Sequence, residues 1–228
     1  MSSLTVRKGA SCLRDGDPTR MRKLVRPCFV AALVALLLAT PVFGKTILFL
    51  GDSLTAGLGV EQAQAYPALI QEKIQEKNLP FEVINAGLSG DTTAGGLARL
   101  DWVLQKKIDV LFLALGANDG LRGLPVMEMK KNLQAIVDRV KAKNPEVKIV
   151  IAGMRMPPNL GSDYAASFQQ VYSDIARDNH ATLVPFLLEG VGGHIDLNQP
   201  DHIHPTAAGH KVVANMVWLV LEPLLTKD

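Results

Sequence analysis

The chain has 228 residues, of which 48% are hydrophobic and 20% are charged, and its formal net charge at neutral pH is +2. Near-neutral charge and an aromatic content of 5% argue against a nucleic-acid partner, which would need a basic surface and rings for stacking. The length is sufficient for one globular domain of ordinary size with a proper core.

The first segment has the pattern of a secretory signal peptide. Arginine and lysine residues gather between 20 and 26, an apolar run covers 29–39, and small or modest residues follow at 40–44. We place the cleavage after Gly44 and expect a domain at 45–228 that is periplasmic or secreted. The apolar run is short for a membrane span, so we expect no stable span in the mature form, although an uncleaved anchor stays open as the alternative.

Both cysteines, Cys12 and Cys28, precede the expected cleavage site. The mature domain would then have no disulfide, no thiolate nucleophile and no cysteine-ligated metal. Cys28 also precedes the apolar run, which is a poor position for lipidation of a mature N-terminus. Met21 could begin a signal peptide of ordinary length, so the sequence leaves open whether Met1 or Met21 is the start.

From residue 46 onward, strand patterns alternate with helical patterns. This alternation predicts a single-domain, three-layer α/β/α sandwich with a five-stranded parallel sheet, as in flavodoxin-like folds, connected by right-handed crossovers. The expected strands are 46–50, 81–84, 109–115, 147–151 and 182–184. The first expected helix begins at about 66 and is ended by Asn78. Four more are expected at about 93–107, 125–143, 163–179 and 206–221, and Pro223 lies just past the last one.

Polar and glycine residues follow several of these strands. Ser53 comes after the first strand, Gly90 lies in a polar turn at 85–93, and Asn118 follows the strand at 109–115. Open α/β sheets carry their active sites at this carboxyl edge. Taken alone, the turn at Ser53 is more typical of an ordinary strand-to-helix connection in which Asp52 or Ser53 caps the helix.

Acyl transfer needs residues of these types. A serine hydroxyl is a weak nucleophile at neutral pH and needs an imidazole to accept its proton, and the imidazole needs an acceptor on its other nitrogen. Asp201 and His204 are close together on a turn before the last helix. The backbone N–H groups of Ser53 and Gly90 and the amide of Asn118 could stabilise the oxyanion that develops.

The polar and glycine residues named above fall in four blocks: Gly51-Asp52-Ser53-Leu54, Asn85–Gly90, Gly116–Asp119 and Asp201–His204. In their order and their spacing, these blocks resemble the motif blocks of the SGNH (GDSL) hydrolases. Shorter matches at Gly95–Leu100, Asn118–Gly123 and Arg155–Pro157 resemble the branch that holds bacterial periplasmic acyl-CoA thioesterase I, lysophospholipase and arylesterase. The resemblance covers about 45–225, and Gly87 stands where some members carry a larger polar residue.

The resemblance implies Ser53 as the nucleophile, His204 as the general base and acid, and Asp201 as its orienting partner. It also implies an oxyanion hole formed by the Ser53 amide, Gly90 and Asn118, with no metal or cofactor. The loop after Asn118 would line the acyl site. The residues expected to contact substrate are Asp119, Gly120, Leu121, Arg122, Arg155 and Pro157.

The activity expected from the resemblance is hydrolysis of acyl esters or thioesters through an acyl-enzyme, with lysophospholipids among the candidate substrates. A carbohydrate acetylesterase on the same fold stays open, although the low aromatic content limits stacking on sugars. A non-catalytic binding module with this fold is the third hypothesis. Two roles also stay open: His202 could replace His204 as the base, and Arg122 and Arg155 could brace loops instead of contacting substrate.

Overall fold

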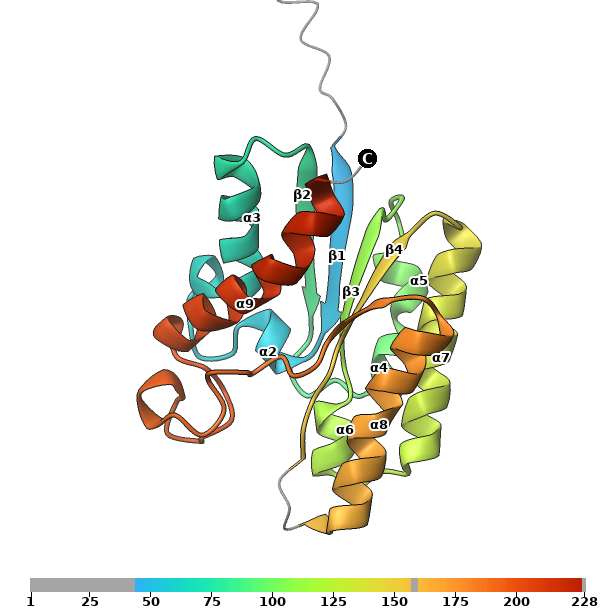
Figure 1. Ribbon diagram of the computed structural model, residues 1–228, viewed down its shortest axis with the longest axis vertical. Coiled ribbons are helices and arrows are strands. Elements are labelled where there is room, and N and C mark those ends of the chain that lie inside the picture. Colours follow the sequence, from blue (N-terminus) through green and yellow to red (C-terminus); the bar gives the residue numbers. More distant parts are fainter. Residues whose placement is uncertain (1–43, 157–159, 227–228) are drawn as a thin grey trace, which may run out of the picture. The chain divides into compact units, whose positions relative to one another are not determined.

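The computed structural model describes residues 44–156 and 160–226, in which a parallel sheet lies between two layers of helices (Figure 1). The five strands follow the order β2-β1-β3-β4-β5. This arrangement confirms the predicted three-layer α/β/α sandwich with a five-stranded parallel sheet. The strands are β1 (Lys45–Gly51), β2 (Phe81–Gly87), β3 (Val110–Ala114), β4 (Lys148–Ala152) and β5 (Thr182–Val184).

Helices cover both faces of the sheet. Helices α3 (Tyr66–Glu76) and α9 (Ala207–Thr226) cover one face (Figure 1). The other face carries α4 (Thr93–Ala98), α5 (Leu100–Val103), α7 (Val126–Lys143) and α8 (Ser162–Asp178). The short helices α2 (Ser53–Ala56) and α6 (Ala117–Leu121) begin just beyond β1 and β3, and the 3₁₀ turns are η1 (Gln62–Gln64) and η3 (Ile195–Leu197).

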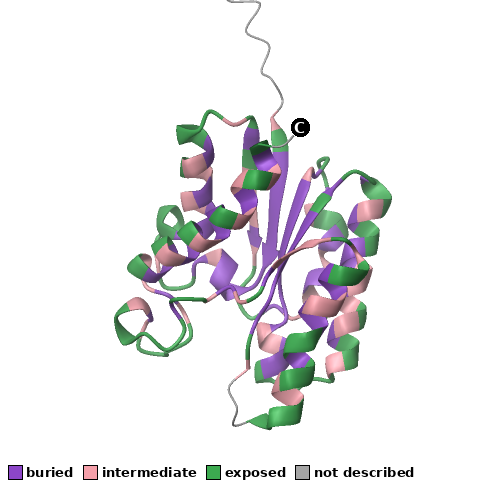
Figure 2. Ribbon diagram, in the orientation of Figure 1, coloured by how far each residue is buried: buried purple, intermediate pink, exposed green. Residues whose placement is uncertain are grey.

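The core follows the apolar strands. Residues 47–50 of β1 are fully buried, as expected for a central strand with helices on both sides. The ring of Phe49 lies 4.8 Å from that of Phe112 and 5.6 Å from that of Tyr66, measured between centroids. Figure 2 shows the sheet as a buried band, with the exposed residues on the outer sides of the helices. Within the described residues, no helix is both long enough and apolar enough to cross a membrane.

The helix expected at 93–107 is wrong as a single element, because it divides at Arg99 into α4 and α5. Arg99 adopts φ −93° and ψ 1° and pairs with Asp91, at 2.7 Å between Nε and Oδ2. A Cβ on Gly95 would collide with the Asp91 carboxylate, so glycine at this position lets the carboxylate approach the helix. The contact with Asp91, in the loop that follows β2, therefore overrides the helical pattern.

Three smaller differences concern element ends. Strand β2 continues through Asn85 to Gly87, and α6 occupies part of the loop expected at 116–123. Helix α9 does not stop before Pro223 but continues to Thr226. Proline removes one backbone donor, which leaves the carbonyl of residue 219 without its helical partner. Leu219 is 74% exposed, so this part of the helix is accessible to water.

The strand order places a topological switch point between β1 and β3. The chain leaves β1 for β2 on one side and then returns to β3 on the other, so the connections diverge above the carboxyl ends of β1 and β3. In register, Gly51 of β1 lies opposite both Gly87 of β2 and Ala114 of β3. The segments that follow these three residues therefore leave the sheet at the same level.

Candidate active site

Ser53 is the first residue of α2, and only Asp52 separates it from the end of β1. The carboxylate of Asp52 caps this helix by accepting the N–H of Leu54 at 3.0 Å. A Cβ on Gly51 would collide with the side chain of Thr55, so the turn needs glycine there. The turn is thus an N-capped strand-to-helix connection, and the same geometry presents the hydroxyl of Ser53 at the edge of the sheet.

Ser53, His204 and Asp201 form a continuous chain of side-chain contacts. The Oγ of Ser53 lies 2.8 Å from Nε2 of His204, and Nδ1 of His204 lies 2.6 Å from Oδ2 of Asp201. The three residues that the sequence singled out for a triad are therefore brought together across 151 positions of the chain.

Asp201 holds the turn that carries His204. Its Oδ1 accepts the N–H of Ile203 at 2.9 Å and the N–H of His204 at 3.0 Å. These backbone bonds, together with the His204 ring, lower the pKa of Asp201 to about 2. Because the carboxylate is ionised at neutral pH, Nδ1 of His204 is the donor to it, and Nε2 is then free to accept the hydroxyl hydrogen of Ser53. His202 lies in the left-handed region, with φ 59°, where the turn reverses.

Gln199 joins the loop that carries His204 (the histidine loop) to the loop that follows Ser53. Its N–H donates to the carbonyl of His204 at 2.7 Å. Its side-chain amide donates to the carbonyls of Leu58 at 2.7 Å and Pro205 at 3.0 Å. Gly59 has φ +81°, which favours glycine, and a Cβ there would also meet this amide. The histidine loop is therefore anchored to the loop that follows Ser53 by hydrogen bonds to both backbones.

Gly90 and Asn118 contribute further donors at the same edge. Gly90 has φ +81°, and its N–H, like that of Ser53, has no hydrogen-bond partner within 44–156 and 160–226. The side-chain nitrogen of Asn118 donates to the carbonyl of Asp91 at 2.9 Å, with Oδ2 of Asp52 at 3.4 Å. These donors come from the segments after β1, β2 and β3, as the register of the strands requires.

Two buried titratable groups lie close to this chain of contacts. Asp52 is 1% exposed, and burial raises its pKa to about 6, although the Leu54 N–H opposes the shift. His210 is also 1% exposed and accepts the N–H of Tyr66 at 3.3 Å through Nδ1, while its Nε2 has no partner among the described residues. Burial lowers the pKa of His210 to about 4, so this histidine is neutral at physiological pH.

The residues expected to contact substrate after Asn118 divide into two groups. Asp119 is 3% exposed, and its two oxygens accept the N–H and the hydroxyl of Thr93 at 2.8 and 2.6 Å. Gly120 is also buried. Leu121 and Arg122 are exposed instead, and Nη2 of Arg122 donates to the carbonyl of Gly90 at 2.8 Å. Only the second group has side chains that a substrate could reach.

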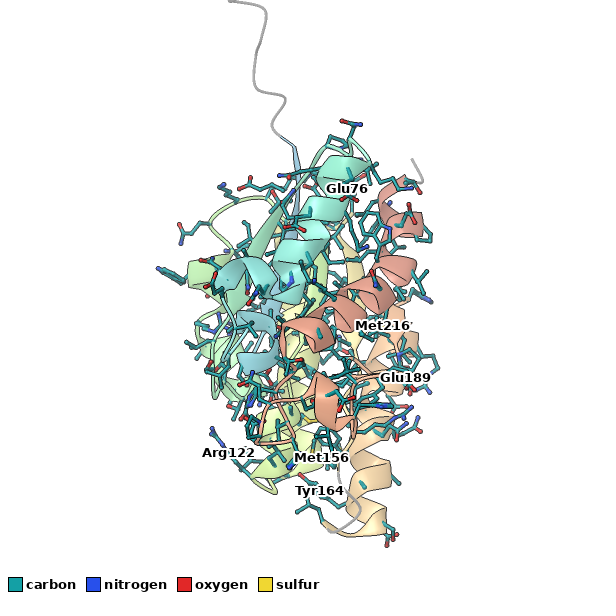
Figure 3. All side chains as sticks on the ribbon, turned by 90° about the vertical axis from the view of Figure 1, so that its left-hand side faces the viewer. Glu76, Arg122, Met156, Tyr164, Glu189 and Met216 are labelled. Atoms are coloured by element: carbon teal, nitrogen blue, oxygen red, sulfur yellow. The ribbon has the colours of Figure 1, made fainter. Side chains whose placement is uncertain are left out.

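Arg155, which follows β4, is held by side chains of the segment that follows β5. Its guanidinium lies 4.7 Å from the centre of the Phe186 ring and 3.5 Å from a carboxylate oxygen of Glu189. The expected contact residue Pro157 lies outside the described residues. Figure 3 shows Arg122, Met156 and Tyr164 at the same end of the molecule, where the hydroxyl of Tyr164 donates to the carbonyl of Leu124 at 2.9 Å.

The supporting contacts of Thr93 and Gln199 were not found from the sequence. Both side chains act through hydrogen bonds to residues far along the chain, and polar residues in loops carry no local pattern that reveals such partners.

Within the described part of the chain, no cluster of three or more His, Cys, Asp or Glu side chains could hold a metal ion.

Residues 49–212 match the sequence profile of the GDSL-like Lipase/Acylhydrolase family. The chain belongs to this family. It is a carboxylic ester hydrolase of the GDSL type, and the family predicted from the four motif blocks is confirmed.

Relatives with similar sequences carry names that fit this family. Esterase TesA of Pseudomonas aeruginosa is 38% identical over 203 residues, which are 88% of this chain and all of that protein. Thioesterase 1/protease 1/lysophospholipase L1 of Escherichia coli K12 is 37% identical over 184 residues, 80% of this chain and 86% of the relative. Arylesterase of Vibrio mimicus is 35% identical over 174 residues, 76% of this chain and 86% of the relative.

Solved structures support the same fold. A crystal structure of TesA matches with a TM-score of 0.76 and 40% identity, covering 79% of this chain and all of the other. Psychrotrophic esterase EstA from Pseudoalteromonas, inhibited by monoethylphosphonate, also gives a TM-score of 0.76, with 34% identity and coverage of 80% and 100%. The SGNH version of the three-layer sandwich is thereby confirmed.

Proposed function

We propose that this protein is a secreted serine esterase that hydrolyses acyl esters and thioesters through an acyl-enzyme. The observation that carries the proposal is the continuous contact from Ser53 Oγ to His204 Nε2 at 2.8 Å and from His204 Nδ1 to Asp201 Oδ2 at 2.6 Å. Such a chain supplies a nucleophile, a base within hydrogen-bond reach and a group that orients the base.

In the acylation step, His204 accepts the hydroxyl proton of Ser53 while Oγ bonds to the carbonyl carbon of the substrate. The carboxylate of Asp201 stabilises the imidazolium that forms. The tetrahedral intermediate then collapses, the bond to the leaving oxygen or sulfur breaks, and His204 returns the proton to the leaving alcohol or thiol. Water enters with His204 again as the base, and the second collapse releases the carboxylic acid and restores Ser53.

The oxyanion of both intermediates would be held by the N–H groups of Ser53 and Gly90 and by the amide of Asn118. The two backbone donors have no partner within the described residues, so they are open to a substrate oxygen. One hydrogen of the Asn118 amide binds the Asp91 carbonyl, while the contact to Asp52 is long at 3.4 Å. The second hydrogen is therefore only weakly bonded and is available to the oxyanion while the first stays on Asp91.

The proposed substrates are acyl esters and thioesters with an apolar acyl group, including lysophospholipids. The names of the relatives as an esterase, a thioesterase with lysophospholipase activity and an arylesterase support this class. Leu121 and Leu124, which are 46% and 37% exposed, provide apolar surface next to Arg122. We propose Leu121 and Arg122 as substrate contacts, whereas Asp119 supports the site from inside the fold.

We also propose that residues 1–44 direct export and are removed after Gly44, which leaves the enzyme in the periplasm. The basic cluster, the apolar run and the small residues support this assignment. Edman sequencing of the protein recovered from a periplasmic extract should begin at Lys45. A start at Met1 or Met21 in membrane-bound protein would instead indicate an uncleaved anchor.

The experiment that tests the activity is hydrolysis of p-nitrophenyl esters of increasing chain length, with palmitoyl-CoA and lysophosphatidylcholine in parallel. The wild type is compared with Ser53→Ala and with Ser162→Ala, a matched control at an exposed serine of α8. We expect activity beyond hexanoyl esters, its loss in Ser53→Ala and wild-type rates in Ser162→Ala.

Other outcomes of this experiment would contradict the proposal. Wild-type rates in Ser53→Ala would refute the nucleophile. Activity confined to acetyl esters would indicate an acetylesterase, and a folded wild type that a fluorophosphonate probe does not label would indicate a binding module.

A further inference from the structure

We infer that Arg99 is a positioning residue that holds the oxyanion hole together. Its role in catalysis rests on the proposed function, but its hold on the backbone can be measured without any substrate. Arg99 lies at the junction of α4 and α5, away from the reacting atoms, and its side chain is 19% exposed.

The guanidinium of Arg99 binds three groups at once. Its Nε donates to Oδ2 of Asp91 at 2.7 Å. Its Nη2 donates to the carbonyl of Ala86 at 2.8 Å and to the carbonyl of Gly51 at 3.1 Å. Ala86 and Gly51 lie at the ends of neighbouring strands, so one side chain joins the carboxyl ends of β2 and β1 to the loop that follows β2.

Two of these acceptors, Gly51 and Asp91, are close in sequence to a proposed oxyanion donor. Gly51 is two residues before Ser53, and Asp91 immediately follows Gly90. The carbonyl of Asp91 in turn accepts the side-chain amide of Asn118 at 2.9 Å. All three donors are therefore linked to Arg99 by the contacts of one guanidinium and one shared aspartate.

The chemistry of the contact requires arginine. A guanidinium is planar and carries five N–H donors in a fixed fork, so it can serve several acceptors in set directions, and it remains charged. A lysine ammonium in the same place is a compact point charge that can pair with Asp91 but does not reproduce the fork. The two carbonyls and the carboxylate are mostly buried, where charge-assisted bonds are strongest.

This arrangement differs from a bond that only adds stability. The N–H of Leu88 also donates to the carbonyl of Gly51, at 3.0 Å, so the loop already touches the end of β1 without Arg99. The guanidinium also fixes the position of Asp91, and therefore that of the neighbouring Gly90, relative to Ser53. Loss of Arg99 should therefore change how the donors are aligned more than whether the protein folds.

The first test compares Arg99→Lys with the wild type, since lysine keeps the charge. Because a displacement of about 1 Å in a catalytic site can cost about 100-fold in rate, we expect kcat to fall by about that factor while KM stays within about threefold. In hydrogen–deuterium exchange, the amides of Leu88 and Asp91 should exchange at least about tenfold faster, with protection in the central strands unchanged.

The matched control is Lys130→Met, which breaks an ion pair of the same 2.7 Å length, with Asp174, between α7 and α8. This variant should keep the wild-type kcat and the wild-type exchange at Leu88 and Asp91. A second variant, Arg99→Ala, should recover activity when guanidinium is added at millimolar concentration, but not when ammonium is added at the same ionic strength.

Three outcomes would overturn the inference. The first is a wild-type kcat in Arg99→Lys together with unchanged exchange at residues 88–91. The second is a rise of exchange in Arg99→Lys that extends evenly over the sheet. The third is that guanidinium acts no differently from ammonium on folded Arg99→Ala. A wild type that hydrolyses no ester refutes the proposed function instead, and selective exchange at residues 88–91 would still establish that Arg99 holds this loop.

Discussion

Asp52 offers a quantitative test of the site, because its carboxyl group is buried next to Ser53 and its pKa is raised to about 6 from 3.8. The folded state then binds the proton more tightly than the unfolded chain does, so ionisation of this group lowers the stability as pH rises through this window. One pKa unit corresponds to about 1.4 kcal/mol, so the ionised form costs about 3 kcal/mol of stability, of which about 2 kcal/mol should appear between pH 4 and pH 8.

The perturbation is Asp52→Asn, which has the same shape and does not titrate. The amide oxygen can still accept the N–H of Leu54, which preserves the cap of α2. Its nitrogen would face the side-chain nitrogen of Asn118, which adds a penalty that does not depend on pH. The stability of the variant relative to the wild type should therefore improve by about 2 kcal/mol from pH 4 to pH 8.

Urea unfolding of both proteins at one-unit steps of pH measures this difference directly. The control is Asp174→Asn, because hydrogen bonds from Lys130 and Gln170 lower the pKa of that carboxylate to about 2. Its contribution is complete above its unfolded pKa, so the control difference should be flat from about pH 5 upward. A flat difference for Asp52→Asn, or one that moves in the opposite direction, would refute the buried, proton-binding carboxyl.

Four further predictions concern single side chains. Asp201→Asn should lower kcat for p-nitrophenyl butyrate by about 10⁴-fold with little change in the melting temperature, because Nδ1 of the base loses its carboxylate acceptor; a loss below tenfold would contradict the triad. Asn118→Ala should lower kcat by about 100- to 1000-fold, as expected for one oxyanion donor, and an unchanged kcat would remove it from the hole. His202→Ala should keep kcat within about threefold of wild type, since a large loss would point to His202 as the base. His210 has a lowered pKa, so its contribution to stability is complete above its unfolded pKa of 6.5 and is lost below it. By pH 4 the wild type should have lost about 3 kcal/mol relative to His210→Gln, as urea unfolding at pH 7 and pH 4 can check.

The sheet could be predicted from the sequence because its strands are short apolar runs whose burial depends only on local composition. Residues 109–115, for example, are apolar without interruption after Asp109 and become the central strand β3. The sequence also predicted that Ser53, Asn118 and His204 come together, because parallel strands bring their carboxyl ends, and the loops that follow them, to one edge of the sheet. For these features, the structure that each local segment prefers agrees with its place in the whole fold.

The sequence could not reveal features that depend on distant partners. The break at Arg99 depends on Asp91, and the burial of Asp119 depends on Thr93 in another connection. Helical periodicity treats α4 and α5 as one element, and the motif pattern treats Asp119 as part of an exposed loop. In both cases, a polar group far along the chain competes with the local preference, and local reasoning does not include that competition.

The separation of 151 residues between Ser53 and its partner His204 has a consequence for when the enzyme becomes active. A contact so distant in sequence forms only after the intervening chain has closed a long loop, which is a late and slow event in folding. In the proposed mechanism, Ser53 gains its base only when the loop that carries His204 has joined the backbone at Leu58 through the side chain of Gln199. Under the proposed mechanism, the nascent or unfolded chain therefore has no esterase activity, and folding itself is the activation step.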